Sequence, residues 1–125
     1  MAKTDQRRKA VRIPPQVAHA VRAAEDKQAN NVVLLDLEKA SGFTDFFLIC
    51  SGNNPRQIRA IADAVMEQLA NEGAKPAHIE GYDRSEWVLL DYFDFIVHIF
   101  APETRAFYDL ERLWGNAERI EVSTG

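Results

Sequence analysis

The sequence contains one cysteine and no apolar run long enough to cross a membrane. The single thiol, Cys50, cannot form an intrachain disulfide, and it lies in the apolar run 46–50, where a cysteine is typically a small buried hydrophobe. A transmembrane helix needs roughly 20 apolar residues in succession, and the first residues lack the apolar stretch of a signal peptide. These absences predict a cytoplasmic protein that has no membrane partner.

The chain also lacks the motifs of a catalytic centre. Its three histidines are scattered without the spacing of zinc ligands. Asp91 and Asp94 could suggest a magnesium site, but their odd spacing places them on opposite faces of a continuous strand. The turn 51–55 could cradle an anion, yet it has neither the Walker lysine nor the dinucleotide pattern, and a capped helix start explains it. The sequence therefore predicts no enzyme, no cofactor and no metal.

Positive charge is concentrated at the beginning of the chain. Residues 1–12 carry five basic side chains against one aspartate, a net charge of +4. Because the whole chain has a net charge of −4, the remaining residues carry −8. An acidic body repels phosphate backbones, which argues against direct, sequence-specific nucleic-acid binding. It favours a basic protein as the partner.

Apolar periodicity predicts alternating helices and strands between residues 15 and 115. One helix start is especially clear, because Asn54 is a good N-cap and Pro55 suits the first helical position. The expected fold is a single α/β domain, 15–115, with a mixed five-stranded sheet and flanking helices, between a basic flexible tail, 1–14, and a C-terminal tail, 116–125. The pattern predicts helices over 16–28, from 55 to the stop at Gly73, and over 102–115, and strands over 32–37, 46–51, 77–82, 87–92 and 95–100.

The last two strands form a predicted hairpin with two different faces, since side chains alternate along a strand. One face is purely apolar and is expected to lie under helices. The other mixes large apolar groups with a carboxylate and an imidazole, which is typical of an interface core with a polar rim. The alternative is that a helix or tail covers this second face and that His98 is an interior histidine whose hydrogen bonds are satisfied. The first face holds Val88, Leu90, Tyr92, Phe95, Val97 and Ile99, and the second Trp87, Leu89, Asp91, Ile96, His98 and Phe100.

The last predicted helix, 102–115, is expected to turn one apolar stripe toward the sheet. Phe107, Leu110 and Trp114 follow helical spacing along it. Pro102 and Glu103 open this helix and Gly115 closes it.

Several blocks of residues resemble the ribosomal silencing factor family, which is also called Iojap. The resemblance covers about residues 16–115, with the blocks in the family's order and at its spacing, and both tails lie outside it. Ordered blocks of this kind are far more specific than any single motif. The matching blocks are 41–52, 56–62, 80–81, 87–91, 94–100 and 105–114.

The resemblance implies a fold similar to nucleotidyltransferases in a family that is not known for catalysis. It implies binding to the large ribosomal subunit through ribosomal protein L-fourteen, which blocks joining of the small subunit and represses translation when nutrients are short. The family is also linked to large-subunit biogenesis. Two other hypotheses stay open: an enzyme acting on nucleotides, suggested by the fold resemblance alone, and a homodimer that uses the mixed face. The expected partner-binding residues are Trp87 and Asp91 first, then Glu80 and His98, with Leu89 and Phe100 from the same face.

Overall fold

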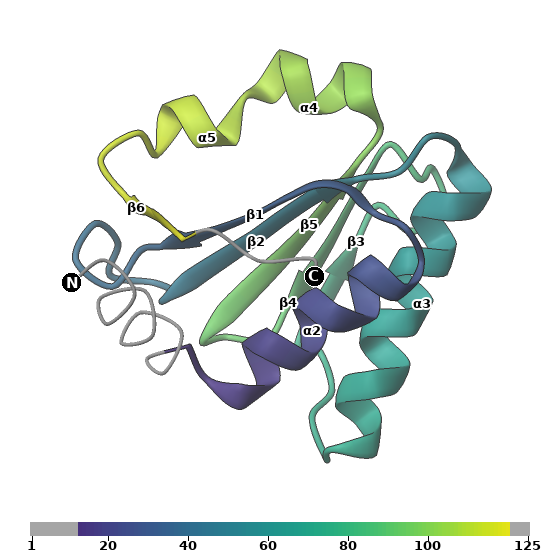
Figure 1. Ribbon diagram of the computed structural model, residues 1–125, viewed down its shortest axis with the longest axis horizontal. Helices are drawn as coiled ribbons and strands as arrows, with labels where there is room; N and C mark the ends of the chain where they lie inside the picture. Colours follow the sequence, from purple (N-terminus) through teal and green to yellow (C-terminus); the bar gives the residue numbers. More distant parts are fainter. Residues whose placement is uncertain (1–12, 121–125) are drawn as a thin grey trace, which may run out of the picture.

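The computed structural model describes residues 13–120 and has three layers, with a central sheet between two pairs of helices (Figure 1). Helices α2 and α3 cover one face of the sheet, and the shorter α4 and α5 cover the other (Figure 1). None of the described helices is long and apolar enough to cross a membrane. The elements in chain order are α2 (Pro15–Asp26), β1 (Asn30–Asp36), β2 (Phe46–Ser51), α3 (Pro55–Asn71), β3 (His78–Glu80), β4 (Trp87–Asp91), β5 (Phe95–Phe100), α4 (Pro102–Tyr108), α5 (Leu110–Leu113) and β6 (Glu118–Ile120).

Helix α3 forms where the sequence predicts it. The Asn54 side chain accepts a hydrogen bond from the Gln57 backbone N–H at 2.8 Å, which satisfies one of the amides left unpaired at a helix start. The helix ends at Asn71, and Gly73 follows with a φ of +84°, a left-handed conformation that glycine adopts without strain. Its buried side chains recur at helical spacing: Ile58, Ile61, Ala62, Val65 and Leu69.

The sheet is mixed and runs in the order β3-β4-β5-β2-β1-β6. Strands β2 and β5 are parallel, whereas the other neighbouring pairs are antiparallel. The predicted antiparallel hairpin of β4 and β5 is confirmed. Every residue of β2 and β5 is buried, as expected for central strands that are covered on both faces.

The α/β class with flanking helices is confirmed, but the predicted strand count of five is wrong. A sixth strand, β6, pairs with β1 and lies in the segment 116–125 that was expected to be a tail. Ile120 lies opposite Leu34 and is 5% exposed, so this segment adds to the core. A strand of three residues is too short to show a period in the sequence. The rest of that segment, 121–125, and residues 1–12 of the predicted basic tail lie outside the described residues.

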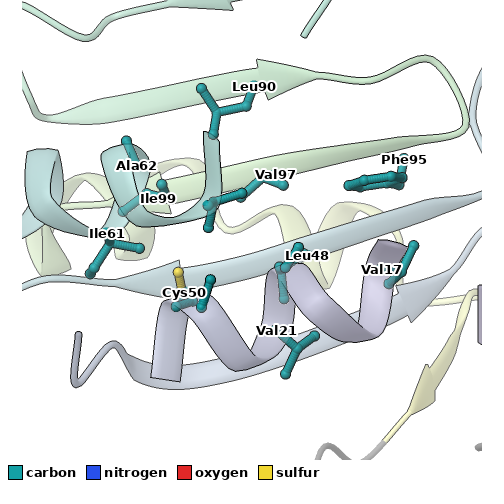
Figure 2. Packing of buried hydrophobic residues seen from close by; sticks show 14 of the residues in the cluster. Val17, Val21, Leu48, Cys50, Ile61, Ala62, Leu90, Phe95, Val97 and Ile99 are labelled. Carbon is teal, nitrogen blue, oxygen red and sulfur yellow. The ribbon is translucent and has the colours of Figure 1, made fainter. Parts of the chain in front are cut away.

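The larger core lies between the sheet and the helices α2 and α3. Figure 2 shows side chains of α2 and α3 meeting those of β2, β4 and β5, including Leu90 and Val97 of the predicted helix-covered face. The whole of that face is buried, so its assignment is confirmed. Cys50 belongs to this core, where burial raises the pKa of its thiol to about 12 and keeps it in the unreactive protonated form.

The predicted last helix is broken into two short helices. Asp109 adopts a left-handed conformation, with φ of 48° and ψ of 57°, between α4 and α5. The break changes the direction of the chain, so the expected inner stripe is only partly right. Leu110 is buried and Trp114 is half-buried, but Phe107 is 78% exposed and points away from the core.

Candidate functional site

The six residues predicted to bind a partner come together on one face of the sheet at β3, β4 and β5. The strand register places Trp87 opposite Phe100, and Leu89 opposite His98. Glu80 of β3 lies opposite Leu89 on the other side of β4. Asp91 ends β4 on the same face, two residues beyond Leu89. The sequence therefore placed these residues in one region correctly.

Their exposure separates these six residues into two groups. His98 is 3% exposed and Phe100 is fully buried, because α4 and α5 fold back over this part of the sheet. The expectation that these two lie on an exposed interface is wrong, and the covered arrangement, held open as the alternative, is what the structure has. Trp87, Leu89 and Asp91 lie half-buried on β4, and Glu80 is exposed on the edge strand.

Trp87 lies where the covered part of this face meets the open part. Its indole Nε1–H donates a hydrogen bond to His98 Nδ1 at 3.0 Å. Its ring stacks on Phe100 with the centroids 4.9 Å apart, and it contacts the Tyr108 ring at 4.8 Å. Trp87 therefore belongs partly to the core, since truncating it would remove contacts with the buried rings of His98 and Phe100.

A cleft of about 500 Å³ adjoins Trp87 between α4 and the connection from β3 to β4. Phe107 and Tyr108, 78% and 50% exposed, form its aromatic wall on α4. Sequence reasoning missed this wall, because it assigned Phe107 to the interior. The one available signal was Asp109, a residue type that tolerates the left-handed conformation at which the helix breaks. The other lining residues are Gly81, Arg84, Glu86, Glu103 and Thr104.

Four carboxylates lie in the cleft or on the same face of the sheet. One oxygen of Asp91 accepts the Phe93 backbone N–H at 2.8 Å and so holds the hairpin turn. Glu80 contacts the His78 imidazole on the edge strand. Glu86 and Glu103 line the cleft beside Trp87, where Arg84 is the basic side chain among the lining residues. The surface thus combines exposed aromatic groups with a net negative rim, which is suited to a basic protein partner.

A second cleft, of about 470 Å³, lies at the carboxyl ends of the parallel strands β2 and β5, where α/β sheets commonly bind ligands. Arg105 is the cation among its lining residues, and its Nη1 donates to Ser51 Oγ at 2.9 Å while Nη2 donates to Glu111 at 2.9 Å. The hydrogen bonds from Arg105 hold the pKa of the Glu111 carboxyl below its usual value. A phosphate would have to displace this carboxylate, so the cleft gives no specific support to a nucleotide-acting enzyme.

Within residues 13–120, no group of three or more histidine, cysteine, aspartate or glutamate side chains is arranged to hold a metal ion.

Comparisons with known proteins identify the family. The family model described as Ribosomal silencing factor during starvation matches residues 10–124. The ribosomal silencing factor of Halalkalibacterium halodurans is 43% identical over 103 residues, which are 82% of this chain and 88% of that protein. A crystal structure of a Chromobacterium violaceum protein superposes with a TM-score of 0.78 at 31% identity, covering 88% of this chain and 91% of that one.

The similarity extends to an organellar protein. The mouse protein named Mitochondrial assembly of ribosomal large subunit protein 1 is 28% identical over an alignment of 91 residues, and the match covers 70% of this chain and 40% of the mouse protein. The family model spans nearly the whole chain, and the bacterial relative covers most of it at well over 30% identity. The chain therefore belongs to the ribosomal silencing factor family.

Proposed function

We propose that this protein binds the large ribosomal subunit through ribosomal protein L-fourteen and prevents the small subunit from joining. Translation is thereby repressed when nutrients are limiting. The protein acts in the cytoplasm by occupying a surface and catalyses no reaction. The observation that carries the proposal is the half-buried Trp87 beside an exposed aromatic wall and a carboxylate rim, in a chain of the silencing factor family.

The chemistry of this surface supports a basic protein partner. Interfaces that bind tightly concentrate aromatic anchors at their centre and leave polar groups at the rim. Trp87 has the position of such an anchor, since His98 and Phe100 hold one side of its ring while part of the residue stays accessible. Glu80 and Asp91 supply negative charge on the same face of the sheet, opposite Leu89 and at the far end of β4, which speeds association with a positively charged partner.

Co-sedimentation with separated ribosomal subunits tests the proposal. We expect the protein to pellet with large subunits and not with small subunits, and to lower the yield of joined ribosomes when both are mixed. Glu80→Lys should weaken the binding because it reverses a charge on the proposed surface. Glu67→Lys is the matched control, since Glu67 is exposed on α3 at the opposite face of the sheet. Equal pelleting with both subunits, or equal effects of the two variants, would contradict the proposal.

The two other hypotheses from the sequence are tested with the same preparation. A homodimer that uses the Trp87 face would appear in sedimentation velocity as a species that grows with protein concentration, and large subunits would dissociate it. An enzyme acting on nucleotides would turn over nucleoside triphosphates in the presence of magnesium, and we expect no turnover above background.

A further inference from the structure

His98 is a deeply buried polar side chain beside the proposed binding surface, and it makes one directional contact. Its Nδ1 accepts the hydrogen bond from the Trp87 indole at 3.0 Å, and its Nε2 has no hydrogen-bond partner among the described residues. Because an indole nitrogen can only donate, Nδ1 must be the unprotonated nitrogen of a neutral ring. Burial lowers the pKa of His98 to about 3, so the ring stays neutral near pH 7 and keeps this acceptor.

The surroundings of His98 hold its imidazole in place. The ring meets Phe47 edge-on with the centroids 4.4 Å apart, and it lies nearly parallel to the Phe100 ring at 6.1 Å. Phe47 in turn packs against Trp114, so the imidazole that carries the acceptor Nδ1 is held by the aromatic core beneath α4 and α5. His98 is 3% exposed and cannot contact a partner protein in this arrangement.

The orientation of the Trp87 indole, by contrast, is not set by its ring packing alone. Its ring contacts with Phe100 and Tyr108 are apolar and tolerate several orientations of the indole. The hydrogen bond to His98 is directional, and turning the indole over would leave a partly buried N–H without a partner. One orientation is therefore favoured before any partner arrives, which lowers the entropy that binding must overcome.

We propose that His98 is a positioning residue for the ribosome-binding surface: its Nδ1 fixes the Trp87 indole in the orientation that docks, and His98 itself touches no partner. The inference rests on the proposed function, because it assumes that Trp87 meets the large subunit. It replaces the expectation that His98 contributes directly to the interface.

A matched pair of variants tests this role. Asparagine places an amide oxygen close to the position of Nδ1, whereas leucine has nearly the same size and shape and no acceptor. We expect His98→Asn to bind large subunits close to the wild-type affinity. His98→Leu should bind about tenfold more weakly, equivalent to about 1.4 kcal/mol. Equal affinity of the two variants, whether both are weak or both are strong, would overturn the proposal.

A double-mutant cycle separates positioning from general packing. Trp87→Phe keeps an aromatic ring and removes the N–H donor, so adding His98→Leu to it should cause no further loss of binding. A loss as large as in the wild-type background would show that His98 acts without Trp87. The thermal stability of each variant is recorded alongside, because a purely structural role predicts that affinity follows stability in all of them.

An NMR measurement on the wild-type protein keeps the test valid even if a variant fails to fold. The chain has two tryptophans, so two indole N–H resonances are expected, and Trp114→Phe identifies the one from Trp87. We expect the Trp87 resonance to exchange slowly with water in the free protein, and fast exchange would overturn the proposal. If the Trp87 resonance is protected in the wild type but Trp87→Ala binds large subunits as the wild type does, the hydrogen bond exists and the proposed binding role of this surface fails.

Discussion

The neutral, buried state of His98 predicts that the protein loses stability in mild acid. His98 has a pKa of about 3 in the folded protein because of burial, against an ordinary value of 6.5. Between these two values the unfolded chain binds a proton that the folded protein does not. The free energy of unfolding therefore falls as the pH drops below about 6.5 and is fully retained above it.

The size of the effect follows from this difference in pKa. One pH unit corresponds to about 1.4 kcal/mol per proton, so lowering the pH from about 7.5 to about 5 should reduce the free energy of unfolding by about 2 kcal/mol through His98 alone. Domains of this kind have total stabilities of about 5–15 kcal/mol, so the loss is a substantial fraction. With an ordinary urea dependence it moves the unfolding midpoint by about 1 M.

Urea titrations followed by far-ultraviolet circular dichroism at both pH values measure the loss. His98→Asn and His98→Leu carry no titrating group at this position, so the wild type should lose about 2 kcal/mol more than either variant. Acidic groups such as Glu25, whose pKa is raised by burial, are present in all three proteins and cancel in the comparison. A loss of the same size in wild type and variants would refute the assignment of His98 as a buried neutral ring.

Three further predictions concern the core, the hairpin and the ion pair of the second cleft. Val97→Asp should unfold the domain, because Val97 is fully buried and an unpaired carboxylate there has no hydrogen-bond partner; a thermal melt compared with Glu67→Lys checks this. Asp91→Asn should keep the turn, since its amide oxygen can still accept the Phe93 N–H, whereas Asp91→Lys reverses the charge. The rate of association with large subunits should therefore fall in the order wild type, Asp91→Asn, Asp91→Lys, and it should depend less on salt in the variants. Unchanged rates would count against a role for this carboxylate. Glu111→Gln should remove part of the stability that the wild type has above about pH 4.5, because Arg105 lowers the pKa of Glu111. The stabilisation from this ion pair disappears as acid protonates the carboxyl. If the free energy of unfolding depended on pH in the same way in both proteins below neutrality, the prediction would be contradicted.

The elements with strong local signals were predictable from the sequence. Helix α3 carries its own N-cap at Asn54, its own stop at Gly73 and a long apolar stripe, so local interactions are enough to define it. Strands β2 and β5 are continuous apolar runs that only the middle of a sheet can accommodate. Parity along the hairpin assigned Val97 to the helix-covered core because alternation is a property of the strand itself.

Other features depend on contacts between segments that are distant in the sequence. The three residues of β6 become a strand only because the edge of β1 offers them hydrogen-bonding groups. The left-handed conformation of Asp109 directs α5 onto the sheet and leaves Phe107 outside, and no periodicity in 102–115 records that turn. Whether a helix covers the second face of the hairpin was therefore undecided by the sequence.

The mixed face of the hairpin shows most clearly which features follow from the sequence and which depend on tertiary packing. The sequence by itself determined that Trp87, Leu89, Asp91 and His98 share one face, because strand geometry alternates side chains without regard to the rest of the molecule. Only the tertiary structure decided which of them is accessible, since α4 and α5 cover His98 and leave Trp87 and Leu89 of β4 half-buried. Burial is a property of the whole packed chain, and for that reason His98, which the pattern placed on an exposed face, lies beneath Trp87 and accepts its indole N–H.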